Sequence, residues 1–274
     1  IQQMKERETN LSWFEEWVLY YQWLWGRESN RMESLAETFG TDHATARRII
    51  RAKLEIIRKA METWPKFVSL EEDRALMNQK WKTKYEKMRI IFWDNTNVPV
   101  PASSDPNINR HTYSHYYNGT VAKGAVFLQL CGWMGTWELF AGTISDSDYQ
   151  KQSKVFEATH AFANADRKDA EEVLPFTNIV DKGYRCIMAA WRAGKQLLLQ
   201  PTFAKSDAKF NSEQVKRSAE VAADRSGNER AVKVAKYSAM IKRGLEENQD
   251  PRMLADAWLV FGFQSNFMYK SVMG

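Results

Sequence analysis

Arg89-Ile-Ile-Phe-Trp-Asp94 is the run on which the architecture of this chain depends. A short apolar run rich in β-branched and aromatic residues is typical of a buried strand. A second run of this kind, Phe176-Thr-Asn-Ile-Val-Asp181, also ends in an aspartate and is followed by Gly183. We therefore expect two buried strands that each end in a carboxylate, so that Asp94 and Asp181 are candidate site residues.

The segments around these two runs alternate between strand and helix patterns. Strands are expected at 89–93, 98–100, within 111–118, at 121–130 and 135–140, before Asp181 and at 196–200, with a loop from Pro99 to Asn109. Helices are expected at 146–162, 184–193, 212–243 and 251–268. Strands first, then alternating helix and strand, then a long helix is the order of an RNase H-like fold. Residues 89–274 are thus predicted to form an α/β domain, a mixed sheet flanked by helices.

The N-terminal part of the chain is predicted to be helical. Residues 1–65 form the first unit, and 66–88 form a polar helical connector. A short helix ends at Gly40, and Thr41 or Asp42 then offers an N-cap for a third helix with an apolar stripe. The expected exposed face of the third helix is basic: Arg47, Arg48, Arg51, Lys53, Arg58 and Lys59.

A short helix, a turn and a basic helix form a helix-turn-helix pattern, which enters the major groove of DNA. An ordinary three-helix bundle with a solvated basic face gives the same pattern. On the helix-turn-helix interpretation, the residues at the start of the third helix contact DNA, and Arg51 lies nearer the phosphates. The residues predicted to bind DNA are His43, Thr45, Arg47, Arg48, Arg51 and, on the later long helix, Arg230.

Composition favours an internal protein that binds polyanions, although weakly. The 274 residues carry a net charge of +5, with 44% hydrophobic residues, and the sequence pI is about 9.0. Two cysteines provide neither a disulfide framework nor a four-thiolate zinc site. No apolar stretch reaches the ~20 residues that span a membrane. We expect a reducing compartment, which for a DNA-acting protein is the nucleus in a eukaryote and the cytoplasm otherwise.

A third acid, Glu229, lies in the long helical segment among basic residues. Each acid also has an ordinary structural interpretation. Asp94 forms a turn at a strand end, Asp181 forms an Asx-turn before Gly183, and Glu229 pairs with Lys233 four residues on. Asp146 and Asp148 are rival acids, and we expect a structural role for Ser145-Asp146 as a helix N-cap.

Five short blocks resemble the Harbinger-type transposases, DDE-superfamily endonucleases with an N-terminal helix-turn-helix. In chain order they are Trp93-Asp-Asn-Thr-Asn-Val-Pro99, Arg110-His-Thr-Tyr-Ser-His-Tyr116, Gly142-Thr-Ile-Ser-Asp146, Val180-Asp-Lys-Gly-Tyr184 and Asn228-Glu-Arg-Ala231. The resemblance spans residues 11–268. Three features depart from the family pattern: Asn97 in place of a glutamate, Gly227-Asn228 before Glu229, and Leu174-Pro-Phe in place of Gly-Asp.

The resemblance implies a DNA transposase or endonuclease that cuts and joins transposon ends. It implies that Asp94, Asp181 and Glu229 are the catalytic residues and hold two Mg²⁺ ions, for which Mn²⁺ substitutes. Carboxylate oxygens suit such hard cations, and paired ions cleave phosphodiesters. The implied partner is double-stranded DNA, both transposon ends and target, with no membrane. A homodimer or higher oligomer and an accessory DNA-binding protein are compatible with this function.

Two other functions remain open at the level of sequence. The first is a domesticated DNA-binding protein that keeps the fold and the helix-turn-helix but has lost catalysis. The second is a nuclease of the same fold that acts on RNA, or on DNA without end specificity. The intact acids favour the transposase over the first alternative, and the basic helix around Arg47 and Arg48 argues against the second.

Overall fold

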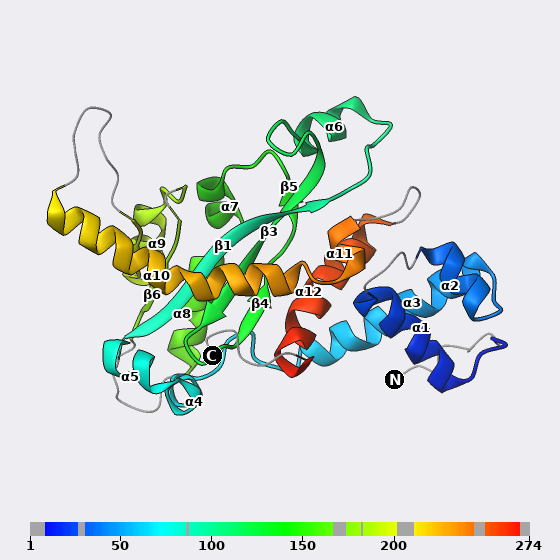
Figure 1. The fold of residues 1–274 in the computed structure, drawn as a ribbon, viewed down its shortest axis with the longest axis horizontal. Coiled ribbons are helices and arrows are strands. Elements are labelled where there is room, and N and C mark those ends of the chain that lie inside the picture. The colour runs from blue at the N-terminus through cyan, green and yellow to red at the C-terminus, as the bar shows by residue number, and fades with distance from the viewer. Residues whose placement is uncertain are drawn as a thin grey trace.

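A mixed β-sheet forms the centre of the molecule, with helices on both of its faces (Figure 1). The computed structural model describes residues 9–26, 31–85, 88–166, 174–181, 183–201, 211–243 and 250–268. The strands are β1 (Arg89–Pro99), β2 (Tyr113–Ser114), β3 (Gly119–Gln129), β4 (Met134–Thr136), β5 (Phe140–Ala141), β6 (Phe176–Ile179) and β7 (Leu197–Leu199).

The helices occur at both ends of the chain and between the strands. Five precede the sheet: α1 (Trp13–Trp25), α2 (Met32–Thr38), α3 (His43–Met61), α4 (Leu70–Leu76) and α5 (Gln79–Tyr85). The others are α6 (Pro106–Thr112), α7 (Asp146–Gln152), α8 (Val155–Ala165), α9 (Ile187–Gly194), α10 (Ser212–Ala235), α11 (Ala239–Arg243) and α12 (Pro251–Met268). The predicted α/β class is confirmed.

Strand β1 is the centre of the sheet, whose strand order is β2-β3-β1-β6-β7. It pairs antiparallel with β3, from Ile91 opposite Gln129 to Pro99 opposite Val121. On its other side it pairs parallel with β6, and β6 pairs parallel with β7. Two parallel strands require a long connection between them. The connection from the antiparallel strands to β6 contains α7 and α8.

The prediction that a strand ends at Asp94 is wrong, because β1 continues to Pro99. Asn95 and Asn97 have low strand propensity, so the sequence pattern breaks there. Pairing with β3 extends through both residues and overrides that local preference.

Alternating side chains of β1 supply two hydrophobic cores. Ile90, Phe92 and Val98 belong to the core on the side of α10 and α12. Ile91 and Trp93 belong to the other core, which α7, α8 and α9 complete. This alternation follows from the two-residue repeat of a strand and explains why the run from residue 89 is apolar on both faces.

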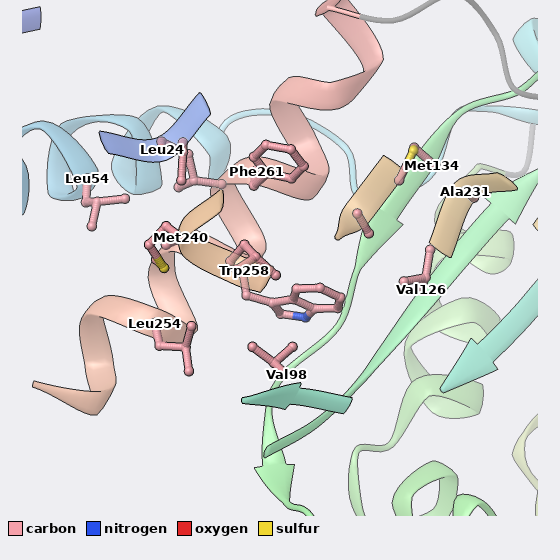
Figure 2. Packing of buried hydrophobic residues seen from close by; sticks show 14 of the residues in the cluster. Leu24, Leu54, Val98, Val126, Met134, Ala231, Met240, Leu254, Trp258 and Phe261 are labelled. Carbon is pink, nitrogen blue, oxygen red and sulfur yellow. The ribbon is translucent and has the colours of Figure 1, made fainter. Parts of the chain in front are cut away.

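The N-terminal helices share the first core with the C-terminal helices. Helix α12 packs against β4 on one side and α3 on the other, and α1 packs against α3 and α11. The resulting cluster extends from Leu24 and Leu54 through Trp258 to Val98 and Val126 of the sheet (Figure 2). Helices α1 to α3 are therefore joined to the sheet through α12.

Several helix boundaries differ from the expected ones. The predicted helix 146–162 is divided into α7 and α8 at Lys154, whose φ of 55° lies in the left-handed region. The predicted helix 212–243 is divided into α10 and α11, and the expected loop after Pro99 contains α6, capped by Asp105. The prediction of a helix over 251–268 is confirmed. Among the described residues, no helix is long and apolar enough to cross a membrane.

Replacing Trp258 with alanine is expected to destabilise the whole molecule. The Trp258 ring is fully buried between the sheet and the helices, and its indole Nε1 donates a hydrogen bond to the Trp137 carbonyl at 2.8 Å. The lost packing should lower the free energy of unfolding by about 3–5 kcal/mol. Urea unfolding followed by circular dichroism measures the change. Met268→Ala on the exposed side of α12 is the control, and a loss below ~1 kcal/mol in Trp258→Ala would contradict the shared core.

Candidate active site and nucleic-acid interface

The register of two adjacent parallel strands brings the two predicted aspartates close to each other, Asp94 within β1 and Asp181 two residues after β6. Arg89 is opposite Phe176 and Phe92 is opposite Ile179. The same register, continued for two residues beyond β6, brings Asp94 opposite Asp181. The structure therefore brings these two candidates together at the end of β6.

The Asp94 carboxyl has an unusual electrostatic environment. Burial raises its pKa to about 6, the positive charge of Arg225 opposes that rise, and the negative charges of Asp181 and Asp146 add to it. Like charges nearby disfavour ionisation, so Asp181 and Asp146 lie close enough to Asp94 to act on its carboxyl. Perturbed carboxyls of this kind are concentrated at functional sites.

Arg225 connects helix α10 to the aspartates. Its Nη1 donates to Asp181 Oδ1 at 3.0 Å. The Arg225 side chain is 13% exposed and that of Asp181 is 48% exposed, so the cation is the more deeply buried partner. The sequence groups Arg225 with the other basic residues of this helix, which could follow DNA phosphates. It does not predict the pairing with Asp181, because one arginine on a helix rich in basic residues carries no distinctive pattern.

Asp146 also belongs to this region. Ser145 is the N-cap of α7, as predicted, and its hydroxyl accepts a hydrogen bond from the Asp148 amide. The Asp146 carboxylate instead accepts hydrogen bonds from Lys123 Nζ at 3.0 Å and Asn95 Nδ2 at 3.1 Å. Gly183 leaves room for this arrangement, because a Cβ there would lie 2.8 Å from Asp146 Oδ2 and the carboxylate would have to shift.

Glu229 is not brought into contact with the aspartates. It is exposed on α10, and within the described part of the chain it forms no hydrogen bond or ion pair, with Lys233 or any other residue. The buried positions of the same helix are Asp224, Gly227, Asn228, Ala231 and Ala235. Arg230, the predicted phosphate contact on this helix, is exposed beside Glu229.

The donor set suits a hard divalent cation only in part. Carboxylate oxygens of Asp94 and Asp181 are the ligands that Mg²⁺ prefers. However, among the residues that the structure describes, no three acids, histidines or cysteines are close enough to hold one ion. Asp181 and Asp146 are instead paired with Arg225 and Lys123. The aspartate pair fits a cation, and the predicted trio is not assembled.

Helices α2 and α3 contain the features expected of the predicted turn. Gly40 follows α2 with a φ of +60°, a conformation that glycine adopts without strain. Asp42 is the N-cap of α3, and hydrogen bonds from Thr45 lower the pKa of its carboxyl. A surface hollow of about 330 Å³ runs along the exposed side of α3, and its lining includes His43, Arg47, Arg48 and Arg51.

The basic face of α3 is smaller than the sequence predicted. Lys53 was expected to be exposed, but it is buried, donates to Glu16 at 2.6 Å and lies over the Trp17 ring. Its long stem packs against α1, which periodicity alone does not reveal. Two arginines also have acidic partners at the C-terminal end of the chain: Arg51 binds Asp250 at 2.8 Å, and Arg58 binds Asp256 at 3.2 Å.

Comparisons with known proteins do not assign this chain to a family. No family model, curated protein or solved structure matches it significantly.

Replacing Lys53 with methionine is expected to destabilise the protein without altering the exposed face of α3. The change leaves the Glu16 carboxylate without its positively charged partner, Lys53, although the Glu16 side chain is only 20% exposed. We expect a loss of about 1–3 kcal/mol, less than for a completely buried pair. Arg48→Met at an exposed position of the same helix is the control and should stay within ~0.5 kcal/mol. Equal stability of the two variants in urea unfolding would contradict the buried ion pair.

Proposed function

We propose that this protein is a metal-dependent DNA nuclease of the transposase type, with an RNase H-like catalytic domain. The observation that carries the proposal is the parallel register of β1 and β6, which, continued two residues past the end of β6, brings Asp181 level with Asp94. Two carboxylates from neighbouring strands, one of them with a raised pKa, form a site suited to divalent-cation chemistry.

The order of elements supports the finer fold assignment. Strand β1 and the antiparallel strands β3 and β4 come first, β6 and β7 follow as parallel strands, and the long helix α10 lies across β1 and β3 (Figure 1). This order of elements supports the proposal of an RNase H-like domain. Fold alone does not establish activity, so the proposal rests on the aspartate pair.

Each candidate residue has a defined role in the proposed reaction. Asp94 and Asp181 would hold Mg²⁺ or Mn²⁺, which when bound activates a water or a DNA 3′-hydroxyl and stabilises the leaving oxygen. Glu229 is the third ligand by family resemblance, and its exposed position on α10 requires a change in its side chain or helix to join the pair. Arg230 beside it would contact a DNA phosphate.

Helix α3 would provide the DNA contacts outside the catalytic site. The lining of its hollow includes His43, Arg47 and Arg48, which are predicted to face the major groove, and Arg51, which is predicted to lie nearer the phosphates; it also includes Glu55. Arginine side chains at such positions read base edges or bind phosphates. Because α3 is joined to the sheet through α12, DNA bound at α3 would have a defined position relative to Asp94.

The second candidate function is a DNA-binding protein derived from a transposase that no longer catalyses the reaction. Two observations favour it. Glu229 makes no contact with the aspartates, and Asp181 is paired with Arg225. The measurement of cleavage separates the two candidates.

Replacing either aspartate with asparagine is expected to abolish DNA cleavage and leave DNA binding intact. Asparagine keeps the shape but removes a charge, and losing several kcal/mol of charge stabilisation slows cleavage about a hundredfold or more. The assay uses the full protein, DNA with its cognate ends and Mg²⁺ or Mn²⁺; Ca²⁺ should permit binding and little cleavage. Asp148→Asn, exposed on α7, is the control. Full activity of Asp181→Asn, or cleavage without metal, would exclude the mechanism, and an inactive wild type would favour the second function.

Removing the charges of Arg47, Arg48 and Arg51 together is expected to weaken DNA binding. Each lost phosphate contact should reduce the slope of log affinity against log salt by about 1, and each lost base contact should cost about 1–3 kcal/mol. Fluorescence anisotropy of the full protein at several salt concentrations measures both. The control removes three charges elsewhere, with alanine at Arg74, Lys80 and Arg192 on α4, α5 and α9. Equal affinity in the two triple variants would contradict recognition by α3.

A further inference from the structure

The guanidinium of Arg225 lies where it interacts with both aspartates. Its Nη1 is 3.0 Å from Asp181 Oδ1. Its positive charge also lowers the pKa of Asp94, whereas burial raises that pKa. The side chain reaches this position from α10, which lies across β1 and β3. One cation therefore pairs directly with Asp181 and also acts electrostatically on Asp94.

Burial distinguishes Arg225 from an arginine that follows a DNA backbone. An arginine that tracks phosphates would be mostly exposed, whereas only 13% of the Arg225 side chain is exposed. It points toward the sheet rather than away from it. The cost of burying a guanidinium is offset only by close negative charges, and the aspartates supply them.

The buried face of α10 also leaves polar atoms without partners. Arg225 Nε, Asn228 Oδ1 and Asn228 Nδ2 are buried, and among the described residues none of them has a hydrogen-bond partner. An unpaired buried donor or acceptor costs about 1–3 kcal/mol. Arg225 therefore holds the aspartates with an incompletely satisfied side chain, and exposing it to solvent recovers part of that cost.

We propose that Arg225 is the resident counter-cation of the aspartate pair, and that it must leave Asp181 before a divalent cation binds there. This inference rests on the proposed metal-dependent function. A guanidinium and a divalent ion compete for the same carboxylate oxygens, so only molecules with a displaced arginine bind the ion. The apparent dissociation constant of the divalent ion therefore equals its intrinsic value divided by the fraction of molecules in which Arg225 is displaced.

The displaced guanidinium has a second use in the same reaction. Its planar fork matches the oxygens of a phosphate, and the ion and the arginine would then share the negative charge of the DNA strand. Arg225 thereby links metal entry to substrate binding. Replacing Arg225 should therefore tighten metal binding but slow the cleavage of DNA.

The test is a calorimetric titration of the full protein with Mn²⁺ alone. Arg225→Gln and Arg225→Met should bind Mn²⁺ about tenfold more tightly than the wild type, because no guanidinium competes. Arg217→Gln removes the same charge from an exposed position two turns earlier on α10 and should change the affinity less than about twofold. Asp94→Asn should lose Mn²⁺ binding, which tests the proposed metal site independently of Arg225.

Unchanged or weaker Mn²⁺ binding in the Arg225 variants would overturn the proposal while Asp94→Asn still reports on the metal site. Absence of Mn²⁺ binding in both the wild type and the variants would overturn both. If the variants fail to fold by circular dichroism, the wild type supplies the answer through the Arg225 Nε–Hε signal in nuclear magnetic resonance. That signal, assigned by triple-resonance experiments on the wild type, should shift as Mg²⁺ is added, and a signal that stays in place would reject displacement.

Discussion

Hydrogen bonding of β1 on both of its edges is the constraint on which the rest of the structure depends. The antiparallel ladder with β3 fixes one edge, and the parallel ladder with β6 fixes the other. Because side chains alternate along the strand, these ladders also decide which residues enter each core. A shift of one residue would exchange Phe92 and Trp93 between the two faces and would separate Asp94 from Asp181.

The sequence predicted those parts of the fold that local pattern controls. The helix at 251–268, the N-cap at Asp42 and the glycine turn at Gly40 have signals within a few residues, and the structure contains all three. The full length of β1 could not be predicted, because Asn95 and Asn97 are held in the strand by β3, which lies more than 20 residues away in the chain. Burial of Lys53 likewise depends on α1.

The candidate site was predictable to a similar extent. Asp94 and Asp181 each follow an apolar run, so their meeting at the sheet could be expected from the two strands. The position of Asp146 near this site could not be predicted, because it depends on hydrogen bonds from Lys123 and Asn95 and on the small size of Gly183. These three residues belong to separate segments. Arg225 was not distinguishable from the other basic residues of α10. Charge compensation in three dimensions leaves no periodic signal in the sequence.

The packing of α3 against α12 has a consequence for the way the protein is made. Helices α1 to α3 are synthesised long before residues 251–268, which complete their hydrophobic faces. These helices would therefore remain partly open during translation, and a chain cut short before α12 would expose Leu24 and Leu54. Synthesis through α12 thereby becomes a condition for stable packing of α1 to α3, so chains that end before α12 would be prone to chaperone capture or proteolysis.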